Sequence, residues 1–110
     1  METKKLHVKE IPPYKQTPAD SRERKNQKIR TDALRREAEK QFKTPITRKN
    51  IRLIIKYCRC KGKSDAVNVI GGIADALNRI AYEDDKQITE IHYQEMRGDI
   101  DEYHASVEEA

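Results

Sequence analysis

Residues 50–94 read "NIRLIIKYCRCKGKSDAVNVIGGIADALNRIAYEDDKQITEIHYQ" and hold the clearest secondary-structure pattern in the chain. Apolar and polar residues alternate over residues 51–58, which is the period of a β-strand. Apolar residues then recur at helical spacing, which predicts a helix from about residue 66 to 79. Alternation returns over residues 88–94, so the stretch predicts a strand, a helix and a second strand. A helix that joins two neighbouring strands favours their parallel pairing.

The segments before this stretch add one strand and one helix to the prediction. Residues 6–11 alternate as a short strand that ends at two prolines. Residues 14–27 are polar and basic without periodicity, which predicts a flexible basic arm. A helix is expected from about Thr31, and it ends before Pro45 because the residue that precedes a proline disfavours the helical region.

The chain as a whole predicts an α+β fold. We expect a small mixed sheet of about three to four strands with two helices packed on it. Residues 1–97 are assigned to this domain, and residues 98–110 to an acidic C-terminal tail that is either frayed or a short helix. Only 35% of the 110 residues are apolar, so the core is modest and would gain from dimerisation or from a bound ligand.

The formal net charge of +4 divides unevenly along the chain. Residues 1–63 carry 20 Lys/Arg and 7 Asp/Glu, hence +13, whereas residues 64–110 carry 3 and 12, hence −9. This division indicates either a polyanion-binding surface beside an acidic site or simply two solvated faces. No apolar run approaches the roughly 20 residues that span a bilayer, so no membrane is expected.

Several aspartates flank or lie within the predicted central helix. Asp65 is placed to cap its N-terminus, Asp75 lies within it, and Asp84 and Asp85 precede the next strand. Carboxylates beside a basic surface suit Mg²⁺-dependent phosphodiester cleavage, although each aspartate alone also fits a cap or a surface residue. The end of one strand and the start of a parallel neighbour lie at opposite edges of a sheet, so helix geometry must bring these carboxylates together.

Two adjacent glycines, Gly71 and Gly72, interrupt the central helix. Each costs about 1 kcal/mol relative to alanine in a helix interior. Close approach of another backbone, or of a phosphate, to this helix face would compensate for that cost. The alternative is a poorly formed turn.

Residues 59–94 resemble the core motif of the RusA family of Holliday junction resolvases, which are common in phages and prophages. The family motif combines D-x-D-N, a following lysine, D-A-L, and D-D-x-Q before a strand. The matching elements of this chain, in register, are the basic run "RCKGK" at 59–63, Asp65, Asn68, "DAL" at 75–77 and "DDKQ" at 84–87.

The resemblance implies a homodimer with two active sites that binds four-way DNA junctions and nicks two strands symmetrically. It implies Mg²⁺ as cofactor, with Mn²⁺ as a substitute, no small-molecule substrate, and a location in the cytoplasm of a bacterial host cell. Asp65 and Asp85 are expected to bind the metal with support from Asp84, while Asn68 and Asp75 complete the catalytic site.

The resemblance also implies a DNA-binding surface made of basic side chains. The expected members are Arg22, Arg24, Lys25, Lys28 and Arg30 of the arm region, Arg59, Lys61 and Lys63 before the central helix, and Lys86 after it. Their positive charges would contact phosphates, which supply most of the affinity of proteins for DNA.

The chain departs from the family motif at two positions. Val67 stands where the motif has a metal-binding aspartate, and Gly71 stands where it has a lysine. Valine offers no ligand, so weaker Mg²⁺ binding and slower cleavage follow, and Lys61, Lys63 or Lys86 would have to supply the missing charge. The sequence thus supports a junction-cleaving endonuclease and, as the alternative, a catalytically inactive junction-binding protein on the same fold. An unrelated small basic nucleic-acid-binding domain is a third hypothesis.

Overall fold

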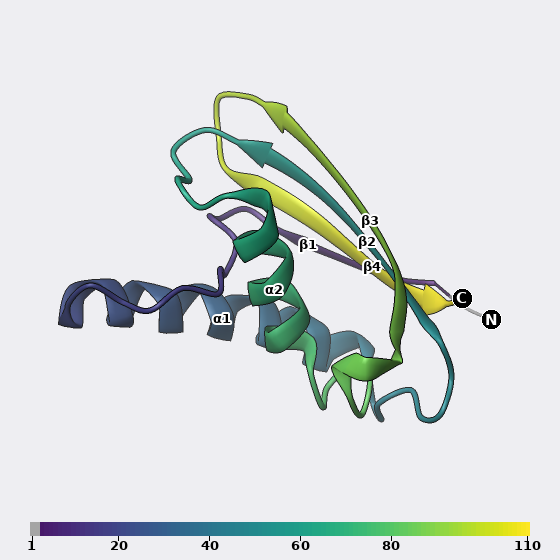
Figure 1. Ribbon diagram of the computed structural model, residues 1–110. Coiled ribbons are helices and arrows are strands. Elements are labelled where there is room, and N and C mark those ends of the chain that lie inside the picture. Colours follow the sequence, from purple (N-terminus) through teal and green to yellow (C-terminus); the bar gives the residue numbers. More distant parts are fainter. Residues whose placement is uncertain (1–2) are drawn as a thin grey trace.

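A computed structural model describes residues 3–110 and shows two helices on one face of a four-stranded sheet (Figure 1). The elements in chain order are β1 (Lys4–Val8), α1 (Ser21–Gln41), β2 (Ile51–Arg59), α2 (Ala66–Leu77), the 3-10 helix η1 (Asp85–Gln87), β3 (Ile88–Arg97) and β4 (Glu102–Glu109). The strand order is β1-β4-β2-β3, with β2 and β3 parallel and β4 antiparallel to both β1 and β2. The predicted α+β class and the parallel pairing are confirmed.

The core lies between the sheet and the helices, and β2 runs through its centre. Alternate β2 residues such as Leu53 and Ile55 are fully buried, as the period-two pattern predicts. Leu53 is paired with Val107 of β4 on one side and with Ile91 of β3 on the other. Ile91 is 47% exposed, because β3 forms the edge of the sheet.

The C-terminal residues are part of the sheet. Instead of a frayed tail or a short helix, they form β4, which lies between β1 and β2. Tyr103, Ala105 and Val107 are buried on the helix-covered face and alternate with more polar residues. The prediction for residues 98–110 is therefore wrong. The alternation of buried and more polar residues determines the structure here in spite of the acidic composition.

The N-terminal half of α1 replaces much of the predicted arm. The helix begins at Ser21 rather than Thr31, and the Oδ1 of Asp20 accepts a hydrogen bond from the Glu23 N–H at 2.8 Å as its N-cap. Figure 1 shows this half of α1 reaching beyond the sheet, so few apolar residues are needed there and no periodicity marks it. Within residues 3–110, no helix combines the length and apolar character required to cross a membrane.

The central helix α2 packs against α1 and carries the core residues Val69, Ile73 and Leu77. The glycine pair has the structural reason that the sequence suggested, because the chain between β1 and α1 crosses this helix. A Cβ at Gly72 would lie only 2.4 Å from the Pro13 carbonyl oxygen, so only glycine allows that backbone to approach.

Candidate active site

Asp65 caps the N-terminal end of α2, as its position in the sequence predicts. Its Oδ1 accepts a hydrogen bond from the Asn68 N–H at 3.0 Å, which occupies one of its two carboxylate oxygens. Asp65 is exposed, and Val67, in the first turn of the same helix, is 78% exposed. Position 67, where the family motif has an aspartate, therefore faces solvent at the N-terminal end of α2.

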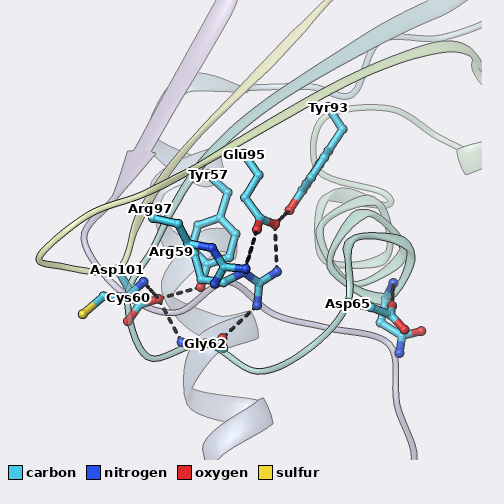
Figure 2. A network of polar contacts seen from close by, with 10 residues as sticks. Tyr57, Arg59, Cys60, Gly62, Asp65, Tyr93, Glu95, Arg97 and Asp101 are labelled. Atoms are coloured by element: carbon cyan, nitrogen blue, oxygen red, sulfur yellow. Dashed lines mark hydrogen bonds and ion pairs between the residues drawn. The ribbon is translucent and has the colours of Figure 1, made fainter.

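A buried ion pair fixes the end of β2 just before this helix (Figure 2). The Arg59 guanidinium donates two hydrogen bonds to the Glu95 carboxylate, at 2.9 and 2.8 Å, and a third to the Gly62 carbonyl at 2.8 Å. The Tyr93 hydroxyl donates to the same carboxylate at 2.6 Å. The Arg59 bonds, helped by Tyr93, lower the pKa of Glu95 to about 2.

Arg59 consequently does not lie on a DNA-binding surface. It is only 6% exposed, and Glu95 and Gly62 engage its guanidinium. The expectation that Arg59 contacts DNA is corrected to a structural role. The alternation of β2 could have indicated this burial. Every second residue of the strand from Ile51 is buried, and Arg59 continues that series.

Asp101 holds the loop between β2 and α2 from the other side. Its carboxylate accepts hydrogen bonds from the backbone N–H groups of Cys60, Lys61 and Gly62, at 2.7 to 3.1 Å, and from the Tyr57 hydroxyl at 2.6 Å. Burial acts to raise the pKa of Asp101, but these bonds outweigh it and bring the value to about 2. Residues 60–62 are thereby held in one conformation ahead of Asp65.

A basic groove lies beside this loop. It is lined by Tyr14, Arg30, Lys61 and Lys63 and reaches Ser64, next to Asp65. Lys61 and Lys63 are exposed, and the Arg30 guanidinium lies over the Tyr14 ring, 5.4 Å from its centroid. The remaining basic residues expected in the arm lie exposed on the first turns of α1: Arg22, Arg24, Lys25 and Lys28.

The other aspartates lie around the C-terminal end of α2. Asp84 caps η1, accepts a hydrogen bond from the Lys86 N–H at 2.9 Å and forms a capping box with Gln87. That backbone bond holds the pKa of Asp84 below its usual range. Burial raises the pKa of Tyr82, and the charges of Asp85 and Asp75 raise it further.

One chain does not bring the expected metal ligands together. The 12 residues of α2 span about 18 Å, with Asp65 at one end and Asp84 and Asp85 beyond the other. Mg²⁺ holds its oxygens at about 2.1 Å, so its ligands must lie within about 4 Å of one another. In residues 3–110 there is no group of three or more His, Cys, Asp or Glu side chains that could hold an ion. The residues of a single chain thus do not fit the metal site that the family implies.

Comparison with protein families gives a match over nearly the whole chain. The family model of the endodeoxyribonuclease RusA matches residues 5–107, which is almost the whole 110-residue chain. No curated protein matches the chain. The matched segment includes most of β1, both helices, β2, β3 and most of β4, hence both ends of α2 with their aspartates. The chain therefore belongs to the RusA endodeoxyribonuclease family, whose members resolve Holliday junctions.

Proposed function

We propose that this protein is a homodimeric, Mg²⁺-dependent endonuclease that nicks four-way DNA junctions symmetrically, and that its present activity is low. The proposal places it in phage or prophage recombination and repair, in the cytoplasm of the host cell. The observation that carries it is the basic groove of Arg30, Lys61 and Lys63 directly beside the Asp65 end of α2. A groove of this kind positions a phosphate backbone next to a carboxylate.

Two copies of the chain supply what one copy lacks. If a second copy packs its α2 antiparallel to the first about a twofold axis, the N-terminal end of each helix meets the C-terminal end of the other. Asp65 of one copy then faces Asp85 of the other, and the same contact occurs twice, as in any isologous dimer. Such a dimer contains two equivalent sites, which is what paired nicking requires.

The exposed side of α2 suits contact with a second copy. Ile70 and Ala74, one turn apart on α2, are only partly buried in the single chain. Ile91 of the edge strand β3 is a further apolar side chain that is 47% exposed. Burying these groups in a dimer removes apolar surface from water, which favours association.

The Mg²⁺ requirement is proposed for the dimer only. Asp65 and Asp85 would hold the ion, supported by Asp84, because hard carboxylate oxygens are its preferred protein ligands. Asn68 and Asp75 lie about two turns apart on one face of α2. Both side chains would orient the bound DNA strand. Arg30, Lys61 and Lys63 would neutralise phosphates on the strand that enters this site.

Val67 favours a second candidate function, a junction-binding protein without cleavage. An exposed valine at the expected ligand position leaves each proposed site one carboxylate short. Phosphate contacts do not depend on that carboxylate, so junction binding would persist.

A cleavage assay separates these two functions. A labelled four-way junction is incubated with Mg²⁺ or Mn²⁺ and either the natural protein, Val67→Asp, or the isosteric control Val67→Asn. We expect all three to bind the junction, and Val67→Asp to cleave on the order of 10²-fold faster than the other two. Equal cleavage by all three would show that position 67 is dispensable, and absence of junction binding would overturn both candidate functions.

A further inference from the structure

The segment between β1 and α1 places Lys15 across the exposed face of α2. The Lys15 N–H donates a hydrogen bond to the Asn68 carbonyl at 2.8 Å, which ties this segment to the first turn of the helix. Gly72 accommodates the backbone at Pro13 and Tyr14, as described above. A Cβ at Gly71 would lie 3.3 Å from both Cβ and Cδ of Lys15, so the lysine stem runs directly over Gly71.

The Lys15 ammonium lies along α2, between its two ends. Its Nζ lies 3.5 Å from Asp75 Oδ2, and the Lys15 side chain is 67% exposed. Asp75 is one turn beyond Gly71 on the face that also carries Val67. In the single chain the ammonium is therefore exposed on the helix face between Asp65 and the C-terminal aspartates.

We infer that Lys15 is the phosphate-contacting cation of this nuclease site, supplied from the segment before α1 rather than from α2. The glycine pair is what allows this: Gly72 admits the backbone, and Gly71 leaves the helix surface clear for the lysine stem. The inference rests on the proposed function, because it assigns Lys15 to the same DNA-binding site.

Lys61, Lys63 and Lys86 are less suited to that position. Lys61 and Lys63 lie before the N-terminal end of α2, and Lys86 lies in η1 beyond its C-terminal end. Lys15 alone among these four lies over the helix at Gly71. A compact charge on a flexible four-carbon stem can move from Asp75 to a phosphate when DNA arrives.

The test uses the full-length Val67→Asp protein as parent and compares Lys15→Ala with Lys40→Ala. Lys40 is a matched control, because its side chain is 69% exposed and ion-paired to Glu37 at the opposite end of α1. Junction binding is measured by fluorescence anisotropy over a series of salt concentrations. Cleavage is measured with Mg²⁺ at saturating junction, and thermal unfolding verifies that each variant is folded.

We expect Lys15→Ala to reduce the slope of log affinity against log salt concentration by the amount that corresponds to about one phosphate contact. Cleavage at saturating junction should be about tenfold slower. Lys40→Ala should match the parent in both. Adding Gly71→Lys to Lys15→Ala should restore the salt dependence and part of the rate, because the charge returns to the same helix face.

The inference is overturned if the parent binds and cleaves normally while Lys15→Ala shows the same salt dependence as Lys40→Ala and cleaves within twofold of its rate. A parent that neither binds nor cleaves a junction would instead overturn the proposed function, and the inference would fall with it. The two failures are therefore distinguishable.

Discussion

The two ends of α2 differ in charge and in how they are fixed. At the N-terminal end, exposed Lys61 and Lys63 precede Asp65, and hydrogen bonds with Arg59 and Asp101 hold the loop in place. At the C-terminal end, the aspartates around η1 are exposed and held mainly by local capping bonds. One end thus presents exposed lysines beside its capping aspartate, and the other collects carboxylates. The proposed dimer would bring these two different ends together in one site.

The largest expected stability effect comes from breaking the buried support of the N-terminal end. Arg59→Ala leaves the Glu95 carboxylate, which is 23% exposed, without its main partner and should cost about 2–3 kcal/mol in the free energy of unfolding. Arg97→Ala is the control, because Arg97 is 78% exposed and lies 3.9 Å from the same carboxylate, so about 0.5 kcal/mol or less is expected. Urea unfolding measures both, and similar losses would contradict the assignment of Arg59 as the support of this end.

The acid sensitivity of the same pair sharpens the comparison. Arg59 lowers the pKa of Glu95 to about 2, from 4.5. The folded state therefore gains stability from this carboxylate above about pH 4.5 and loses it as the pH falls towards 2. Glu95→Gln should cost about 2 kcal/mol at pH 7, and its difference from the natural protein should shrink on acidification below pH 4.5. A difference that stayed constant between pH 7 and pH 2 would refute the ion-pair explanation.

The smallest expected effect concerns Val67 itself. Val67→Asp places a carboxylate in the first turn of α2, where the helix dipole favours negative charge, and Val67 makes little buried contact. Thermal unfolding of the protein should show a gain of about 0.3–1 kcal/mol for Val67→Asp relative to Val67→Asn. A loss of stability would mean that the position is not the open one described here, and cleavage results for this variant would then need another explanation.

The central strand–helix–strand unit was predictable because its apolar periods match its burial. The same reasoning located the Asp65 cap and the reason for the glycine pair. It failed in the highly charged segments. Strand β4 was not predicted although Tyr103, Ala105 and Val107 alternate with more polar residues. The start of α1 was not predicted because that end of the helix lies beyond the sheet and carries no apolar period. Lys15 was also missed, since nothing in a single sequence shows which distant segment crosses Gly71.

The separation of the aspartates follows from topology alone. In a parallel pair, the C-terminal end of β2 and the N-terminal start of β3 lie at opposite ends of the two strands. Asp65 and Asp85 of one chain could therefore be expected to lie far from each other. The sequence could not show whether the connecting helix overcomes this separation. The structure shows that α2 maintains the separation, because the helix runs from the C-terminal end of β2 back towards the N-terminal end of β3 (Figure 1).

A subunit-mixing experiment tests the two-chain site most directly. Asp65→Asn and Asp85→Asn are each introduced into the Val67→Asp protein, and the two inactive variants are mixed, unfolded and refolded together. If each site takes Asp65 from one chain and Asp85 from its partner, every mixed dimer regains one intact site. About a quarter of the parent's nicking activity should then return on the four-way junction. A mixture that stays inactive, while the Val67→Asp parent cleaves, would contradict the account.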